Sequence, residues 1–356
     1  MSNKLPILIT GAGAPGIAGT IFSIKNNPDN IDFKIVTTDI KDNPVGKFLS
    51  ESFYRVPSPE SEDYIPVLKR IIKKEKVRVI LPQTTREINV LSQKKEEIKK
   101  KGANIVVSDN ESIKKANDKY LIIKECENIG IPYPKYFLIN SKRAFLEALD
   151  ILGYPDNKVV IKPRLSNGLR GLRIITEDVL NLDRFLNEKP SGLEINLRSL
   201  LDILQQDRFP ELLVEEYLPG EEYTVDVFRN SKGIVVIPRL RISIRSGITF
   251  DTKVDLRKGI IEYSKKLAIS LCLKYCFGFQ FKLDINGIPK ILESNPRVQG
   301  TMITTTFAGF NMIYYSVKEA LGEEVNLENI KIKNGIEFKR YWGGIGLDEE
   351  NFIGRI

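Results

Sequence analysis

The sequence contains no histidine, and it has only three cysteines among its 356 residues. Without imidazole there is no histidine general base and no zinc site of mixed Cys and His ligands, so any chemistry must use other groups. Cys272 and Cys276 lie four residues apart in the apolar stretch "KKLAISLCLKYC". This spacing predicts two core thiols on one face of a helix rather than a disulfide or a metal pair, which fits a cytoplasmic protein.

The sequence also has no long uninterrupted hydrophobic run near its start. Residues 5–24 carry no charge, but they include four glycines and two prolines, and their apolar core is only "LPILI". A membrane span or a signal peptide needs a longer apolar segment. The pattern instead predicts a strand, a turn and the start of a helix, and we expect no membrane partner.

Charge is only mildly unbalanced. Lys and Arg outnumber Asp and Glu by 54 to 46, and the net charge of +8 is spread along the chain. The densest run, "KKEEIKKK" at 94–101, mixes signs at helical spacing, which predicts a solvated helix face rather than a nucleic-acid patch. We therefore expect no nucleic-acid partner, although the basic excess would favour anionic small molecules.

The first third of the chain alternates between predicted strands and helices. Such alternation predicts a small parallel α/β unit, which ends near residue 110 where two helices closed by Gly130 begin. We place this first domain at 1–111. Strands are predicted at 5–10, 33–39, 77–82 and 103–108, and helices from about 16 and at 61–75 and 85–101.

After residue 130, strands and hairpins surround a few helices, which is typical of α+β modules. We place a second domain at 112–220, which contains an irregular polar stretch from 176 to 210. A third domain, at 221–356, contains a predicted helix at 255–276. The predicted fold class is therefore α/β plus α+β.

A glycine-rich turn, "ITGAGAPGIAG" at 9–19, follows the first strand. Its Gly11-x-Gly13-x-x-Gly16 pattern is typical of dinucleotide sites, and Asp39 follows at about the 20-residue spacing of a ribose-binding acid. A full dinucleotide fold needs two βαβαβ halves, however, and the alternation ends after one. An NAD-dependent oxidoreductase therefore stays an alternative interpretation.

Two lysines occupy positions where a charge is unusual. Lys119 continues an apolar stripe on a helix predicted at 118–129, so it either points inward toward an anion or snorkels at the helix start. Lys162 ends the apolar strand "VVIKP", which suggests that this strand ends at a site. The next stretch, "SNGLRG" with Gly168 and Gly171, is either a phosphate-binding loop or a plain hairpin loop.

A hairpin gives the most specific prediction. Asn286-Gly287 is the strongest two-residue hairpin signal, and it pairs Ile285 with Ile288. This register sets Gln280 opposite Glu293, with cross-strand Cβ atoms roughly 5 Å apart.

The residues around that predicted pair form an oxygen-rich set. Asn295 lies on the same strand face as Glu293, and Arg297 follows closely. Amide and carboxylate oxygens suit Mg²⁺ that also holds phosphates, and an arginine can oppose phosphoryl charge. A surface network of Gln, Glu and Arg is the alternative, but the flanking "FGFQF" and "IPKIL" are strongly apolar.

Two further stretches carry charges beside predicted strands. In "VEEYLPGEEYTVDV" one strand ends near Glu215, Pro219-Gly220 turns the chain, and Glu222 begins another strand. The backbone of such a strand edge can hydrogen-bond an adenine, and an acid there can bind the ribose hydroxyls. "IPRLRISIRSG" puts three arginines on one strand face, as either an anion grip or a solvent-exposed face. These arginines are Arg239, Arg241 and Arg245.

Together these motifs resemble the ATP-grasp superfamily, in particular its branch similar to the large subunit of carbamoyl phosphate synthetase. The resemblance covers nearly the whole chain. It implies an N-terminal Rossmann-like pre-ATP-grasp domain followed by a two-subdomain ATP-grasp fold that clamps ATP. The sequence departs from the family at the lid, with the bulky Leu169 and Arg170, and at Thr85, where relatives often carry an acid.

The resemblance also implies a role for each candidate residue. The implied Mg²⁺ ligands, with Mn²⁺ as the alternative metal, are Gln280, Glu293 and Asn295. The implied catalytic residues are Arg297, at the transferring phosphoryl group, and Arg241. The implied nucleotide-binding residues are Lys119, Lys162, Ser166, Asn167, Gly168, Glu215, Glu216, Tyr217, Leu218 and Glu222. The implied substrate contacts are Gly13, Arg239, Arg245 and Gly300.

The implied activity is an ATP-dependent ligase. It would join a carboxylate, of an amino acid or another small acid, to an amine through an acyl phosphate, with release of ADP and phosphate. Such chemistry depends on positioning and on charge neutralisation by Mg²⁺, Lys and Arg, so it suits a chain without histidine. A non-catalytic ATP-binding module is a further alternative. We expect small-molecule partners, and whether the chain forms a homodimer stays open.

Overall fold

The computed structural model describes residues 4–166, 168–177, 182–187, 192–349 and 351–356. By its internal contacts the chain divides into two compact units. Unit 1 comprises Met1–Asn117, Glu222–Phe281 and Glu293–Ile356, and unit 2 comprises Asp118–Glu221 and Lys282–Leu292. The division into domains at residues 111 and 220 stays a prediction, and each unit is described separately below.

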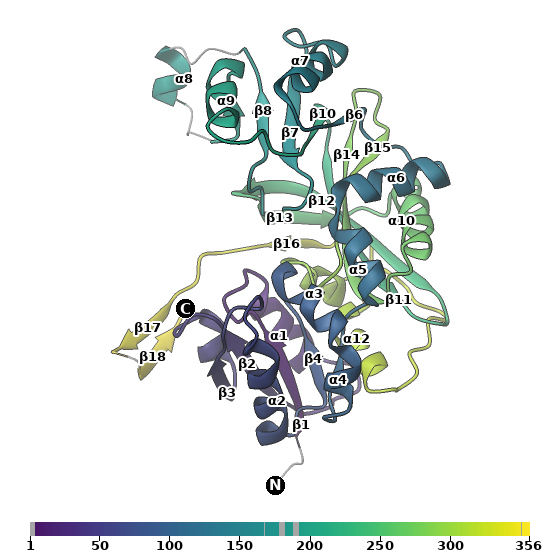
Figure 1. Cartoon of the computed structure of the whole chain (residues 1–356). Helices are drawn as coiled ribbons and strands as arrows, with labels where there is room; N and C mark the ends of the chain where they lie inside the picture. The colour runs from purple at the N-terminus through teal and green to yellow at the C-terminus, as the bar shows by residue number, and fades with distance from the viewer. Residues whose placement is uncertain (1–3, 167, 178–181, 188–191, 350) are drawn as a thin grey trace. The chain divides into compact units, whose positions relative to one another are not determined.

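The N-terminal part of unit 1 is a five-stranded parallel sheet in the order β3-β2-β1-β4-β5 (Figure 1). Ile7 and Ile9 of β1 pack into one hydrophobic cluster and Leu8 into another, so both faces of the sheet are covered. This arrangement confirms the predicted Rossmann-like domain. Its strands are β1 (Leu5–Thr10), β2 (Phe33–Asp39), β3 (Ser52–Arg55), β4 (Val79–Leu81) and β5 (Asn104–Ile105). Its helices are α1 (Ile17–Lys25), η1 (Val45–Leu49), α2 (Tyr64–Glu75), α3 (Thr85–Gln93), α4 (Lys95–Lys99) and α5 (Asn110–Asn117).

Two details of this domain differ from the sequence prediction. The edge strand β3 was not predicted, because its four residues are half-buried or exposed and show no apolar alternation. The single helix predicted at 85–101 is interrupted at Lys94, where φ is −99° and ψ is 11°. Neither Gly nor Pro marks that break, so the sequence pattern gave no sign of it.

Unit 2 contains a five-stranded sheet in the order β6-β10-β7-β8-β9. The stretch 176–210, predicted as irregular, in fact contains α8, β9 and α9, so that prediction was wrong. Asn196 caps α9 by accepting from Ser199 N at 2.8 Å, and Leu200 packs into the core of the unit. The strands are β6 (Tyr136–Ile139), β7 (Val159–Pro163), β8 (Arg173–Ile175), β9 (Glu194–Ile195) and β10 (Leu212–Glu216). The helices are α6 (Lys119–Ile129), α7 (Lys142–Ile151), α8 (Leu182–Asn187) and α9 (Leu197–Leu204).

A six-stranded sheet with the order β15-β14-β11-β12-β13-β16 contributes the rest of the core of unit 1. The tip of its β14–β15 hairpin, Lys282–Leu292, groups with unit 2. The strands are β11 (Glu222–Arg229), β12 (Ile234–Arg245), β13 (Ile248–Val254), β14 (Tyr275–Leu283), β15 (Pro289–Asn295) and β16 (Glu337–Lys339). The helices are α10 (Lys258–Ser270), α11 (Ile303–Phe307) and α12 (Met312–Ala320), and a separate hairpin is formed by β17 (Ile345–Asp348) and β18 (Asn351–Arg355).

The predicted pair of core thiols is wrong. The helix α10 ends at Ser270, so Cys272 lies in a turn with a φ of 53° and is exposed. Cys276 is buried on β14, and burial raises the pKa of its thiol to about 12. The apolar run that suggested one long helix is divided between a helix end and a strand.

Across the described residues, every helix is too short or too polar to cross a bilayer.

Candidate nucleotide and metal site

Lys119 is directed into unit 2, which agrees with the inward one of its two interpretations. Asp118 caps α6 by accepting from Tyr120 N and Leu121 N, and Arg164 Nε holds the same carboxylate at 2.7 and 2.8 Å. The first helical residue, Lys119, is thereby fixed with only 6% of its surface exposed. Its Nζ donates to the carbonyl of Ser166 at 2.8 Å and to the Ser166 hydroxyl at 3.2 Å. Two residues predicted to bind nucleotide therefore meet at the start of the glycine loop.

Lys162 lies on β7, next to the proline that ends the strand. Its Nζ is 2.7 Å from Glu215 Oε2 on β10, and both side chains are almost fully buried. The other oxygen, Glu215 Oε1, is buried without a hydrogen-bond partner among the described residues. Lys162 Nζ also donates to the carbonyl of Leu292 at 3.4 Å, the residue directly before Glu293. A buried carboxylate oxygen without a donor is costly, so this position fits a ligand that supplies one.

Three further candidates lie on the segment after Glu215. Glu216 accepts from Lys135 N at 2.8 Å and pairs with Lys290 Nζ at 2.6 Å, so its carboxylate is occupied by protein donors. The ring of Tyr217 lies under Lys282 Nζ at 5.0 Å from its centroid, and Leu218 is buried. These contacts favour a structural role for Glu216. That the backbone of this segment binds adenine stays a prediction.

The glycine loop between β7 and β8 contains strained backbone. Gly168 and Gly171 have positive φ angles, as does Leu169, at 63°. A Cβ at Gly171 would lie 2.5 Å from Pro163 Cγ, so only glycine fits there. Asn167 lies outside the described residues. The role of Ser166, Asn167 and Gly168 in binding phosphate stays a prediction.

The proposed metal ligands occupy the β14–β15 hairpin. Asn295 Nδ2 donates to Glu293 Oε1 at 3.2 Å, while Ser294 between them is buried, so the two side chains share a strand face. Arg297 Nη2 donates to Asn295 Oδ1 at 3.2 Å. A carboxylate, an amide and a guanidinium therefore follow one another along the end of β15. Gln280 on β14 is half-buried, like Glu293 and Asn295.

The register predicted for this hairpin is wrong at the turn. Asp284 N donates to Ile288 O and Gly287 N to Asp284 O, so the loop has three residues and Asp284, not Ile285, pairs with Ile288. Gly287 has a φ of 75°, as the last position of such a loop requires. If β14 and β15 pair without a bulge from the Asp284–Ile288 pair onward, Leu292 lies opposite Gln280. A direct Gln280–Glu293 pair therefore no longer follows from the turn.

Arg297 is held by several neutral acceptors. Its Nε donates to Thr85 Oγ1 at 2.9 Å and its Nη1 to Val298 O at 2.8 Å. Burial lowers the pKa of Arg297, while the charges of Glu293 and Glu87 oppose this shift. Arginine titrates so high that it nevertheless stays cationic at neutral pH. Thr85, where an acid is common in the family, thus contacts the arginine without neutralising it.

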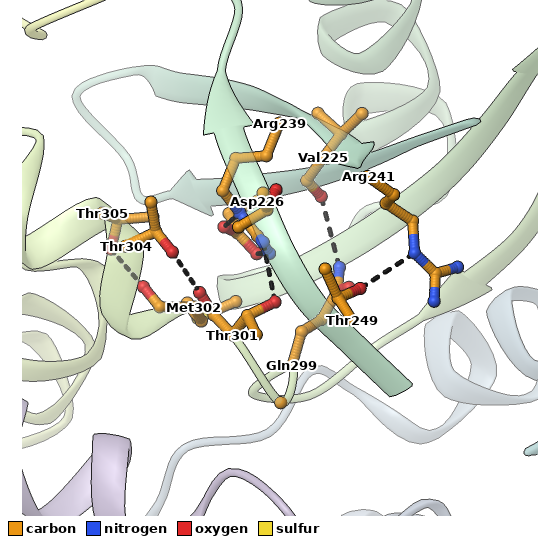
Figure 2. A network of polar contacts seen from close by, with 12 residues as sticks. Val225, Asp226, Arg239, Arg241, Thr249, Gln299, Thr301, Met302, Thr304 and Thr305 are labelled. Carbon is orange, nitrogen blue, oxygen red and sulfur yellow. Dashed lines mark hydrogen bonds and ion pairs between the residues drawn. The ribbon is translucent and has the colours of Figure 1, made fainter. Parts of the chain in front are cut away.

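The three arginines of β12 lie in different environments, and Figure 2 shows two of them, Arg239 and Arg241. Arg239 donates to both oxygens of Asp226, at 2.6 and 3.1 Å, and to Thr301 Oγ1 at 2.7 Å. Neither side chain of the Arg239–Asp226 pair is exposed to solvent. A substrate contact by Arg239 would therefore require this pair to open.

Arg241 and Arg245 do not share the environment of Arg239. Arg241 pairs with Glu222 and donates to Thr249 Oγ1 at 2.8 Å, so an implied catalytic residue contacts the implied ribose acid. Arg245 is exposed, with its guanidinium 4.7 Å from the centroid of the Phe250 ring. The expected common face is wrong, because β-bulges after Arg241 break the alternation of β12. The side chains of Ile242 and Ile244 in the same stretch are exposed.

Sequence reasoning missed Arg340, which follows β16. Its Nε donates to Thr249 O at 3.0 Å, its Nη1 to Pro15 O at 2.8 Å, and its Nη2 to Gly300 O. A Cβ on Gly16 would lie 2.9 Å from Gly300 Cα, so these backbones touch. Arg340 thus joins the N-terminal glycine turn to the loop after β15. No spacing pattern in "GIEFKRYW" indicated this role.

The contacts of the N-terminal glycine turn, residues 9–19, test whether it could bind a dinucleotide as an NAD-dependent oxidoreductase would require. Gly13 N donates to Asp39 Oδ2 at 2.7 Å, so the acid that would bind a ribose instead holds the turn. Gly46, in η1, donates its N–H to Ala12 O, and a Cβ on Gly46 would lie 2.7 Å from that oxygen. The turn is therefore covered by its own domain, which disfavours a dinucleotide there.

The residue types proposed as metal ligands, Gln280 on β14 and Glu293 and Asn295 on β15, fit Mg²⁺ only together with a further ligand. Across the residues that the structure describes, no three Cys, His, Asp or Glu side chains group so as to hold a metal by themselves. One carboxylate and two amides are hard oxygen donors, which suit Mg²⁺ when phosphate oxygens complete its shell. One carboxylate and two amides are therefore a suitable set of protein ligands for a Mg²⁺ ion that is also bound by nucleotide phosphates.

Two family models match large parts of the chain. Residues 208–341 match a family described as ATP-grasp in the biosynthetic pathway with Ter operon, and residues 7–106 match the PylC-like N-terminal domain. The chain therefore contains an ATP-grasp domain behind a PylC-like N-terminal domain. ATP-grasp proteins bind ATP, with Mg²⁺ as the usual metal.

Among curated proteins, the chain is similar to carbamoyl phosphate synthase large chains. That of Clostridium acetobutylicum is 24% identical over 328 residues, which cover 89% of this chain and 27% of that protein. That of Clostridium botulinum strain Alaska E43 is 25% identical over 314 residues, which cover 85% of this chain and 26% of that protein. The chain thus spans about a quarter of the length of these relatives.

Solved structures share the fold at lower identity. N5-carboxyaminoimidazole synthetase from Staphylococcus aureus, complexed with ADP, matches with a TM-score of 0.68 and 18% identity, over 93% of this chain and 80% of that one. The β-γ-ATP complex of biotin carboxylase from Campylobacter jejuni matches with a TM-score of 0.68 and 19% identity, over 92% of this chain and 73% of that one. The predicted ATP-grasp fold is confirmed.

Proposed function

We propose that this protein is an ATP-dependent carboxylate–amine ligase. A substrate carboxylate attacks the γ-phosphorus of ATP, the bond to the β-phosphate oxygen breaks and ADP leaves. An amine then attacks the acyl phosphate, loses a proton and displaces phosphate, which leaves an amide. The carboxylate would belong to an amino acid or another small acid.

The side chains divide this work between cations and oxygen donors. Lys119 and Lys162 bind ATP phosphates through ammonium groups that the fold already keeps away from water. Arg297 places a fixed positive charge where negative charge develops on the transferring phosphoryl group. Gln280, Glu293 and Asn295 would hold Mg²⁺, which neutralises phosphate charge when bound. No step needs a histidine.

The buried pair of Lys162 and Glu215 is the observation that carries the proposal. The pair is incomplete, since Glu215 Oε1 lacks a donor, and Lys162 also contacts the carbonyl directly before Glu293. A nucleotide supplies what this arrangement lacks, because an adenine amino group can donate to the carboxylate and a phosphate can accept from the lysine. The likeness to structures described with ADP and ATP agrees with this interpretation.

Glu293→Ala tests the metal assignment. We expect ADP formation, driven by the active acid and amine, to fall at least about a hundredfold, because the only carboxylate of the metal set is lost. The active pair is first found by screening phosphate release over amino acids and small acids with ATP and Mg²⁺. Coupled ADP assays measure the rate, and isothermal titration measures ATP affinity.

The matched control is Glu262→Ala, which removes an exposed carboxylate from α10 of the same unit. It should leave the rate unchanged. Wild-type turnover by Glu293→Ala would refute the metal assignment. ATP binding without phosphate release for any acid and amine would identify a non-catalytic ATP-binding module, and tight NADH binding would support the oxidoreductase instead.

A further inference from the structure

The loop after β15, residues 296–302, is held to the six-stranded sheet by the side chain of Gln299. This residue is only 6% exposed, and its Nε2 donates to Val225 O of β11 at 3.3 Å (Figure 2). In the order of the sheet, β14 lies between β15 and β11. The side chain of Gln299 therefore reaches across β14 and bonds to the strand beyond it.

Gly278 of β14 provides the space for this crossing. A Cβ on Gly278 would overlap the Gln299 amide, and it would lie 2.9 Å from Val225 O. The φ of Gly278 is not positive, so the backbone conformation does not require glycine here. Glycine inside a strand weakens the strand and often marks a close approach by another group. The amide of Gln299 is that group.

The crossing lies next to the proposed metal ligands. Gln280 follows Gly278 by two residues on β14, so the two positions share one face of the sheet. Two residues after Gln299, Thr301 Oγ1 accepts from Arg239 Nη1 of β12 at 2.7 Å (Figure 2). The loop is thus anchored at two points, on β11 and on β12.

The guanidinium of Arg297 depends on the path of this loop. Its Nη1 donates to Val298 O at 2.8 Å, and Val298 directly precedes Gln299. Its other two acceptors, Thr85 Oγ1 and Asn295 Oδ1, belong to α3 and β15. A shift of the loop would therefore move one acceptor of the guanidinium relative to the other two.

We propose that Gln299 is a positioning residue for Arg297, and that the missing side chain of Gly278 gives its amide the space to act as one. The proposal rests on the proposed function, in which Arg297 faces the transferring phosphoryl group. Gln299 acts through the loop and not on the substrate. It fixes the cation before ATP binds, so that the charge needs no reorganisation during the reaction.

Gly278→Ala tests this proposal, because the new methyl group expels the Gln299 amide. We expect kcat for ADP formation, with the active acid and amine, to fall at least about tenfold. The KM for ATP should stay within about twofold of the wild type, because Lys119 and Lys162, proposed to bind the phosphates, belong to unit 2. The matched control is Gly259→Ala on α10, where an added Cβ meets nothing within 4 Å. It should keep the wild-type kcat.

Gln299→Ala and the double variant test whether the two residues form one anchor. Gln299→Ala should lower kcat as much as Gly278→Ala, and the double variant should be no slower than either, because the same anchor is lost in all three. Gln299→Met keeps the length of the side chain and removes only the donor, so it decides the question if Gly278→Ala does not fold. Its kcat should fall at least about threefold.

Wild-type kcat in Gln299→Met or in folded Gly278→Ala would overturn the proposal. So would single losses that multiply in the double variant, or a KM for ATP that rises as much as kcat falls. Hydrogen exchange of the Met302 amide, which donates to Gln299 O at 3.1 Å, reports on the loop without any substrate and should be faster in Gly278→Ala. A wild type that forms no ADP with any acid and amine would refute the proposed function alone. Equal exchange in the two proteins would overturn the positioning role.

Discussion

The protein contains two buried ion pairs that differ in how completely they are satisfied. In the Arg239–Asp226 pair both carboxylate oxygens accept a hydrogen bond, and Thr301 accepts a third from the guanidinium. In the Lys162–Glu215 pair one carboxylate oxygen has no donor among the described residues, and the second contact of the lysine is long, at 3.4 Å. Burial is similar in the two pairs, so it does not explain the difference.

This difference in hydrogen bonding distinguishes a pair with a structural role from a pair that is suited to bind a ligand. A buried pair whose hydrogen bonds are complete gains nothing from a ligand, and it serves to fix two strands of the sheet. A pair that is buried but incomplete carries a desolvation cost that a ligand can relieve. By this criterion Arg239 has a structural role in unit 1, and Lys162 is predicted to bind the nucleotide. The following predictions test that separation.

Arg239→Met should have the largest effect on folding. It leaves Asp226 buried without a partner, and we expect the free energy of unfolding to fall by about 3–5 kcal/mol. Urea denaturation followed by circular dichroism measures this. The double variant Arg239→Met/Asp226→Leu should recover most of the loss, because no charge is then buried. A loss no larger than that of a surface pair would contradict the scaffold role.

Lys162→Met should act mainly on the ligand. We expect ATP affinity, measured by isothermal titration, to fall about ten- to hundredfold, or about 1.4–2.7 kcal/mol, because the phosphates lose a buried cation. The matched control is Lys158→Met, just before the same strand, where the lysine is partly exposed and pairs with Glu194. That control should bind ATP like the wild type. Equal ATP affinity in all three proteins would remove Lys162 from the nucleotide site.

Thr301→Val should have the smallest effect. The variant keeps the shape of the side chain but removes the acceptor of Arg239 Nη1, so the free energy of unfolding should fall by about 1 kcal/mol. Urea denaturation again measures the change, and the ATP affinity should stay constant. If the free energy of unfolding fell as much as for Arg239→Met, the Thr301 hydroxyl would contribute more to stability than the ion pair with Asp226, which contradicts this ranking.

The sequence predicted those features that depend on local apolar periodicity. The parallel N-terminal sheet follows from buried strands such as Leu5–Thr10, whose core residues are apolar on both faces. The apolar stripe at helical spacing left two orientations of Lys119 open, inward or snorkelling, and the structure shows the inward one. Glu293 and Asn295 were predicted on one strand face because they are two residues apart, and Arg297 was predicted beside them because it follows closely in the sequence.

Features that depend on distant partners could not be predicted in this way. A period of two shows that Arg239 and Arg241 share a face, but whether that face is buried depends on Asp226 of β11. Asn286-Gly287 is compatible with a loop of two or of three residues, and the structure has three. Arg340 has no local signal at all, because its partners Pro15 and Gly300 are far away in the chain.

The contact between Gly16 and Gly300 has a consequence for how glycine signatures are interpreted. Gly11 has a φ of 67°, and a Cβ there would lie 2.6 Å from the Thr84 methyl carbon. Gly16 admits the backbone of Gly300, and a Cβ on Gly13 would lie only 3.2 Å from Asp39 Oδ2, which accepts from the Gly13 amide. Internal packing therefore accounts for all three positions without any cofactor. In this protein the dinucleotide-like glycine pattern is therefore explained by close internal packing around one turn.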